Sequence, residues 1–168
     1  GDVENQVLIR QTPTGIRESR ELQLAKSLVT SSHALIRPYF LQHLPEVSAP
    51  IVVCKDINID YAFMAANRDQ QGRNHLTISY NRFDKNIHEF FKNRAGRISV
   101  CAHFLHGITH ELIHFSQSPT PDKPHNETYR EWTEGTAFCI SWLILSELYQ
   151  KAQSESWFWL FHKSPESM

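Results

Sequence analysis

The sequence predicts a single α+β domain. Its 168 residues have the length of one domain, and 40% hydrophobic with 21% charged residues is typical of a globular protein rather than a disordered one. Short β-branched or alternating segments lie in the first half of the chain, and segments with helical apolar spacing precede and follow them. We therefore treat residues 1–168 as one domain, with residues 1–15 as a polar, flexible lead-in.

The first half of the chain contains one helical region and the expected strands. Apolar residues recur at helical spacing over residues 16–40, which predicts one or two helices, disturbed at Pro38. The run Ile-Val-Val-Cys at 51–54 predicts a strand, and the alternation over 75–80 predicts another. Residues 57–65 are either a further strand or an irregular connection.

The second half is predicted to be helical. Residues 86–95 form a short amphipathic helix in this prediction, and residues 98–116 form a long, largely buried one. Three prolines within 118–124 indicate a loop. A second long helix then begins near residues 126–128 and runs to about residue 152, followed by a last short helix over 154–162.

Residues 110–114 read His-Glu-Leu-Ile-His inside the first long helix. On a helix His110 and His114 project from one face about 40° apart, one turn above the other, so their imidazoles can bind one Zn²⁺. Glu111 lies on the adjoining stripe, where its carboxylate can take a proton from a metal-activated water without being a ligand. The motif predicts a zinc site with Glu111 as general base, and the alternative is a helix with incidental surface histidines.

A catalytic zinc also needs a third protein ligand and an open position for water. The candidates downstream of the motif are His125, Glu127, Glu131, Glu134 and Glu147. We favour Glu134, because a helix that returns from the loop brings this residue back across the first helix. Glu131 shares a helical face with Glu134 and either orients the metal site or is a solvated charge. Glu147 lies about 220° around the helix from Glu134, so one straight helix cannot present both to a metal.

The chain resembles the gluzincin metallopeptidases, in which His-Glu-x-x-His is followed by a Glu on the next helix. The gap from His114 to Glu134 is similar to that of the thermolysin family, and residues 132–137 resemble the Trp-x-x-Glu-Gly-x-Ala segment of zinc aminopeptidases. Residues 134–143 are similar to the third-ligand helix of small phage-repressor-cleaving peptidases. The similarity covers roughly residues 75–145.

This resemblance implies a zincin-like fold, with a small twisted sheet packed on the active-site helix and the third-ligand helix after it. The edge strand of such a sheet holds an extended substrate by main-chain hydrogen bonds. Residues 75–80 would be that strand, with a plain core strand as the alternative. The family also uses a downstream side chain to stabilise the oxyanion, for which Tyr129 or His125 is the candidate here.

The same five-residue motif occurs in clostridial neurotoxin light chains, whose third Glu lies farther along the chain. Glu147 is nearest to that spacing, so a bacterial effector or toxin protease is a second interpretation. The chain also departs from the thermolysin pattern, because Phe138 stands where those enzymes carry an Asp that supports a metal histidine. This departure concerns the catalytic details more than the metal.

We therefore expect a zinc metallopeptidase, a hydrolase that cleaves peptide bonds with a metal-activated water. In this hypothesis His110, His114 and Glu134 hold Zn²⁺, while Glu111 and Tyr129 are the catalytic residues. Two alternatives are a catalytically silent zincin, whose metal holds two helices together while a surface binds a partner, and a metal-free helical interaction domain.

The expected partner is a protein or peptide substrate. A net charge of −1 provides no basic field for nucleic acid. No apolar run approaches the ~20 residues that cross a bilayer, so no integral membrane segment is expected. The three cysteines form no CxxC pair, which indicates free thiols and fits a cytoplasmic protein or a secreted effector without disulfides.

Two further clusters have competing interpretations. His103, His106 and His110 also share a helical face and could form an alternative metal site with His106. Residues 157–161 read Trp-Phe-Trp-Leu-Phe, which fits a terminal helix docked on the core, a dimer interface or a membrane-surface contact.

Overall fold

The described part of the chain is α+β, as the sequence predicts. The computed structural model describes residues 8–11, 20–45, 47, 50–55, 64–79, 87–117 and 127–151. In chain order the elements are β1 (Leu8–Gln11), α1 (Arg20–Phe40), β2 (Ile51–Lys55), β3 (Met64–Arg68), β4 (Asn74–Ser79), the 3₁₀ helix η2 (His88–Phe91), α3 (Arg94–Ser116) and α4 (Glu127–Lys151).

The strands form one four-stranded sheet in the order β1-β2-β4-β3. β1, β2 and β4 are parallel, with Ile51 opposite His75, and β3 runs antiparallel to β4, with Met64 opposite Ile78. β3 is therefore an edge strand and β4 an internal one. The expectation that residues 75–80 form the edge strand is wrong, because β4 pairs with β2 on one side and with β3 on the other.

The tight connection between β3 and β4 explains this order. Asp69 Oδ1 accepts hydrogen bonds from the backbone N–H groups of Gln71 and Arg73, both over 2.9 Å. Gly72 has φ +77°, a left-handed conformation that glycine adopts without a steric cost. The turn folds β3 back on β4 as a hairpin and leaves the other side of β4 to β2.

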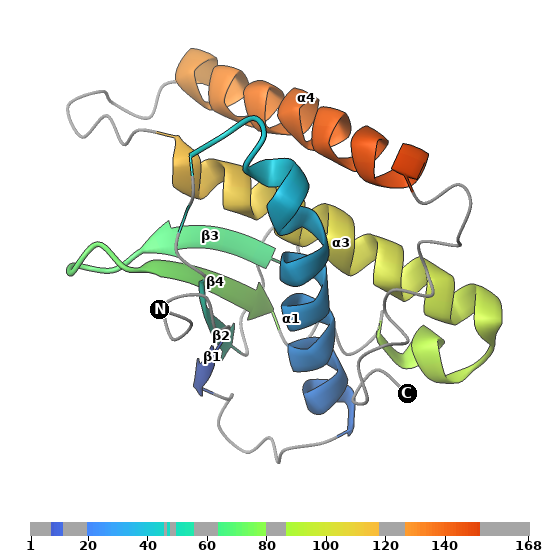
Figure 1. The fold of residues 1–168 in the computed structure, drawn as a ribbon. Helices are drawn as coiled ribbons and strands as arrows, with labels where there is room; N and C mark the ends of the chain where they lie inside the picture. Colours follow the sequence, from blue (N-terminus) through green and yellow to red (C-terminus); the bar gives the residue numbers. More distant parts are fainter. Residues whose placement is uncertain are drawn as a thin grey trace.

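Helix α3 is buried on three of its sides. It contacts the sheet through β3, and it also contacts α1 and α4 (Figure 1). Its buried side chains include Phe104, Leu105, Ile108, Leu112 and Ile113, each at most 2% exposed. Projected at 100° per residue, the buried residues cover most of the helix circumference and leave one stripe open. That stripe carries four histidines, at positions 103, 106, 110 and 114.

The start of α3 is fixed against η2. Asn93 caps the helix, because its Oδ1 accepts a hydrogen bond from the N–H of Gly96 over 2.8 Å. A Cβ at Gly96 would collide with the backbone carbonyl of Glu89, so only glycine allows this close approach. Gly96 therefore lies inside the first turn of α3, and residues 94 and 95, predicted to end a preceding helix, already belong to α3.

Several boundaries differ from the prediction. Leu8–Gln11 form β1, within the region predicted to be a lead-in. β3 runs from Met64 to Arg68 and so extends past residue 65, where the predicted strand or irregular connection ended. α1 continues past Pro38 to Phe40. The predicted loop over 118–124 and the predicted helix over 154–162 lie outside the described residues.

The described cysteines are free, as the sequence predicts. Cys101 is buried and Cys139 is exposed, and both thiols are free. Burial raises the pKa of the Cys101 thiol to about 12. Among the described helices, none combines the length and apolar character that a membrane crossing requires.

Candidate metal centre

Three side chains from two helices meet at one point. His110 Nε2 lies 2.9 Å from Glu134 Oε2, and His114 Nε2 lies 3.2 Å from Glu134 Oε1. The two imidazole nitrogens are 3.1 Å apart. Each residue offers one ligand atom, and all three of these atoms lie within 4.8 Å of one another. The arrangement is able to hold a metal ion.

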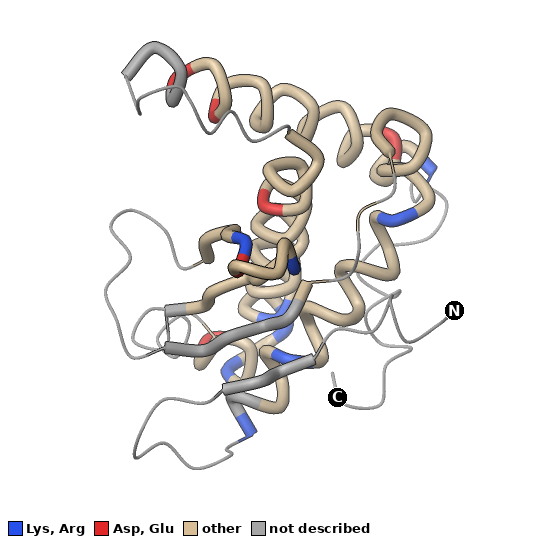
Figure 2. The backbone as a smooth tube through the Cα atoms, turned by 90° about the vertical axis from the view of Figure 1, so that its left-hand side faces the viewer, with Lys and Arg blue, Asp and Glu red and all other residues tan. Residues whose placement is uncertain are grey.

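The fold creates this convergence from two separate segments. His110 and His114 stand on the open stripe of α3, about one turn apart. α4 packs along α3, and its first turns lie beside the last turns of α3 (Figure 1). Acidic positions of α4 lie near its two ends rather than in its middle (Figure 2). Glu134 is the acidic residue that α4 brings to the two histidines.

Gln117 holds one of the histidines, and the sequence analysis missed it. The side-chain carbonyl of Gln117 lies 2.8 Å from His114 Nδ1, and its amide donates to the backbone carbonyl of Thr133 over 3.0 Å. Because the amide nitrogen of Gln117 donates to Thr133, its carbonyl oxygen is the atom that faces His114. This oxygen can only accept, so Nδ1 of His114 carries the hydrogen and donates it. The lone pair of Nε2 is then directed at His110 and Glu134, as a metal ligand requires.

Glu111 lies beside the three groups but is not one of them. Its Oε2 accepts a hydrogen bond from the backbone N–H of Ala66 over 2.8 Å, so α3 and β3 are joined at this carboxyl. Burial raises the pKa of the Glu111 carboxyl to about 7, although His114 and the Ala66 N–H oppose the rise. The carboxyl is therefore poised between its charged and neutral forms near neutral pH.

The imidazole of His110 is disposed to remain neutral. Burial lowers its pKa, and the neighbouring His114 lowers it further, whereas Glu134 acts in the opposite direction. A neutral imidazole keeps the lone pair that coordinates a metal. The Glu134 side chain is 54% exposed, so one side of the group faces solvent.

The other candidate ligands have different positions. Glu147 forms an ion pair with His43 over 2.7 Å, at the opposite end of α4 from Glu134. Glu131 is exposed, as the solvated-charge alternative predicts, and the side chain that contacts His114 Nδ1 is Gln117. The side chains of His125, Glu127 and Tyr129 lie outside the described residues, so Tyr129 stays a prediction.

The alternative metal face through His106 is not formed in the described part of the structure. The one potential metal-holding group there contains neither His103 nor His106. His106 Nε2 instead lies 2.8 Å from the hydroxyl of Tyr149, and its ring meets the edge of Trp142 with 6.2 Å between centroids. His106 therefore joins α3 to α4 beyond the metal group.

Comparisons of the chain with models of protein families, with curated proteins and with solved structures found no match. The geometry of His110, His114 and Glu134 is therefore the basis of the proposed function.

Proposed function

We propose that this protein is a zinc-dependent metallopeptidase of zincin-like architecture. His110, His114 and Glu134 hold Zn²⁺, and Glu111 is the general base. The observation that carries the proposal is the meeting of two imidazole nitrogens and a carboxylate, with a second carboxyl held just outside them. Catalytic zinc sites combine three protein ligands with an open position, and the exposed side of Glu134 supports such a position.

The distances fit a zinc ion. Ligand atoms at 2.0–2.1 Å from a tetrahedral zinc are about 3.3 Å from one another. The two imidazole nitrogens are 3.1 Å apart, and the two oxygens of Glu134 lie 2.9 Å from one of them and 3.2 Å from the other, so small side-chain shifts would admit an ion with the carboxylate as a ligand. Two imidazoles and one carboxylate are also a donor set that zinc accepts.

A bound zinc would polarise the scissile carbonyl and lower the pKa of water beside it. Glu111 then takes a proton from that water and passes a proton to the leaving amine. The hydrogen bond from Ala66 keeps the Glu111 carboxyl oriented during both transfers. Gln117 keeps the ring of His114 in the orientation that coordination needs.

The edge strand β3 supports the same proposal. Because the Ala66 N–H is bonded to Glu111 and not to β4, the main-chain groups of Met64, Ala66 and Arg68 point away from β4. The Ala66 N–H is taken by Glu111, so in this proposal an extended peptide pairs with the other main-chain groups of the edge. β3 thereby takes the role that the sequence analysis gave to residues 75–80.

The test combines metal content with hydrolysis. We expect about one zinc per chain by elemental analysis, cleavage of denatured casein, and a loss of roughly 10²–10⁴-fold in rate for Glu111→Gln with zinc retained. Glu131→Gln is the matched control, because it removes an exposed carboxylate near the site and should change neither property. Zinc-free protein, or full activity of Glu111→Gln, overturns the proposal. A zinc-loaded parent protein without hydrolysis would leave a silent metal-binding module instead.

A further inference from the structure

Aromatic side chains continue the line of the metal ligand along α4. Glu134, Phe138 and Trp142 are spaced at i, i+4 and i+8, so they form one stripe that rises about 6 Å per step. Phe138 is 59% exposed and Trp142 is 52% exposed, although both are large apolar side chains. Their rings contact each other edge to face, with centroids 6.4 Å apart. Exposed aromatic residues in contact with each other indicate a binding surface.

This surface is connected to the open stripe of α3. The ring of Trp142 contacts His106, which lies one turn before the metal ligand His110. Burial lowers the pKa of His103 and of His106, so both rings are uncharged at neutral pH. The surface that leads away from the metal group is thus aromatic on α4 and neutral on α3.

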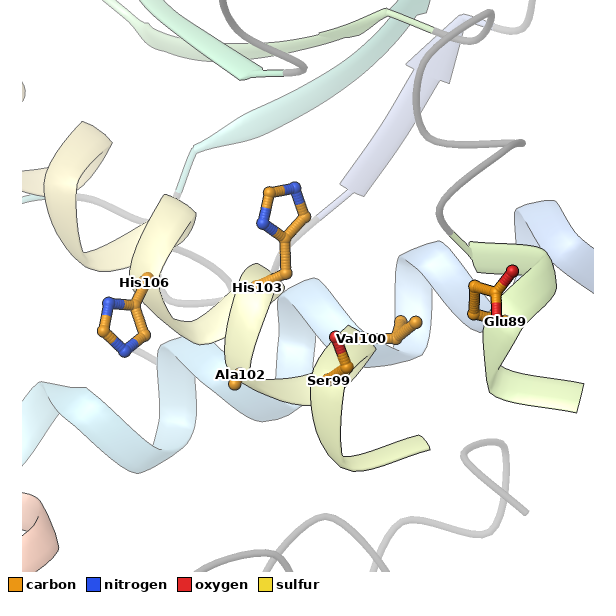
Figure 3. Close-up of a pocket in the computed structure, with 6 residues that line it drawn as sticks. All are labelled: Glu89, Ser99, Val100, Ala102, His103 and His106. Carbon is orange, nitrogen blue, oxygen red and sulfur yellow. The ribbon is translucent and has the colours of Figure 1, made fainter. Parts of the chain in front are cut away.

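A pocket lies at the far end of the same stripe. It has a volume of about 440 Å³, within the range of pockets that accept a ligand, and is lined by Glu89, Ser99, Val100, Ala102, His103 and His106. Figure 3 shows the lining residues of α3 along one helix, with Glu89 projecting from η2. His103 stands seven residues before His110, so the pocket is about 10 Å from the metal group along the helix.

We propose that Phe138 and Trp142 bind large apolar side chains of an extended polypeptide substrate, several residues from the bond that is cleaved, and that the substrate continues toward the pocket at His103 and His106. This inference rests on the proposed function. An extended chain advances about 3.3 Å per residue, so about four residues reach from the metal group to Trp142. We name the aromatic pair together with the pocket the distal recognition surface.

A polypeptide substrate fits this surface better than a second copy of the chain. Glu134 belongs to the same stripe as Phe138 and Trp142, so a symmetric dimer formed through this stripe would cover the metal ligands. A substrate has to reach the metal group, and an extended chain that does so passes beside the aromatic pair. Aromatic anchors of this kind dominate the binding energy of many interfaces.

The test compares two tryptophans of α4 that are similarly exposed. Trp142→Ser removes an anchor of the distal recognition surface. Trp132→Ser removes a side chain that is 58% exposed and about 160° around the helix from Glu134. We expect Trp142→Ser and Phe138→Ser to lower kcat/KM for reduced, carboxymethylated casein by roughly tenfold or more through KM, with kcat retained. Trp132→Ser should stay within about twofold of the parent protein, and thermal unfolding shows whether each variant is folded.

A binding measurement separates this inference from the proposed function. Zinc-loaded Glu111→Gln is titrated with labelled casein by fluorescence anisotropy, with and without Trp142→Ser. Weaker binding of the double variant supports the surface even if no hydrolysis is seen in any variant, which would overturn the proposed function alone. Equal binding and equal kcat/KM for parent, Trp142→Ser and Phe138→Ser overturn the inference. A parent dimer that Trp142→Ser converts to a monomer also overturns it.

Discussion

Helix α4 contacts a histidine through a glutamate at each of its ends, and the two contacts have different structures. Glu134 lies 2.9 Å from His110, and Glu147 lies 2.7 Å from His43. The second oxygen of Glu134 reaches His114, whereas the second oxygen of Glu147 is buried and has no hydrogen-bond partner among the described residues. A single short distance is therefore no indication of a metal site, whereas ligand atoms from three side chains that converge make such a site possible.

The residues around the two contacts also differ. At the Glu134 end, Gln117 holds the ring of His114, and Glu111 stands beside the group with its own support from β3. At the Glu147 end, the partner His43 belongs to the turn that follows α1. We infer that the Glu147 contact ties that turn to α4, and that the Glu134 contact serves chemistry.

Exchanging each glutamate for its amide should produce the largest difference. We expect Glu134→Gln to lose zinc on dialysis and Glu147→Gln to keep it. Because zinc at a thousand times its Kd stabilises the folded state by about 4 kcal/mol, added zinc should raise the melting temperature of Glu147→Gln but not of Glu134→Gln. Elemental analysis and thermal unfolding with and without zinc measure both effects, and the opposite pattern would make Glu147 the third ligand.

Removing the support of His114 should have an intermediate effect. Without the Gln117 amide the imidazole is free to rotate, so we expect Gln117→Ala to weaken zinc binding by about 10–100-fold. Competition with a chromogenic chelator measures the affinity. Gln150→Ala, at the exposed far end of α4, is the control. An unchanged affinity for Gln117→Ala would show that the ring is held by other groups.

Breaking the second contact should have the smallest effect. His43 and Glu147 are partly exposed, with side-chain exposures of 27% and 30%, so solvent screens their attraction. We expect a coupling of about 0.5 kcal/mol from a double-mutant cycle of His43→Gln and Glu147→Gln in urea unfolding. Zinc affinity should not change in any member of the cycle. A change in zinc affinity would mean that the two ends of α4 are coupled.

The long helices were predictable because their side chains repeat a strong pattern. The first long helix was predicted over residues 98–116, and α3 extends from Arg94 to Ser116. The second was predicted from residues 126–128 to about residue 152, and α4 extends from Glu127 to Lys151. The motif then needed only this helix to place His110 and His114 together. The position of Glu134 followed from the return of the chain.

The strands were less predictable because pairing between distant residues decides them. β3 reads Met-Ala-Ala-Asn-Arg, and only Met64 is buried, so its sequence lacks an apolar signal over the full strand. β1 pairs with β2, which lies 43 residues later in the chain by the register of Leu8 and Ile51. The order of the strands is a property of the whole sheet, and no local pattern shows that β4 is internal.

The role of Gln117 has a similar explanation. Gln117 follows the last residue of α3, three positions after His114, and its amide is oriented by the backbone of Thr133 on the next helix. Its spacing from His114 was available in the sequence, but a glutamine near the end of a helix is usually solvated. The contact with α4 is what distinguishes it.

The three-sided burial of α3 separates the residues that hold the fold together from those that do the chemistry. Substituting Phe104 or Ile108 removes apolar packing from the interior, with the usual loss of 2–5 kcal/mol for a large-to-small change. The histidines on the remaining stripe fill no such space. Under the proposed function, natural variation on this stripe can therefore alter the metal preference, or abolish hydrolysis, while the chain still folds, and a relative that lacks the histidines would be an inactive scaffold with the same architecture.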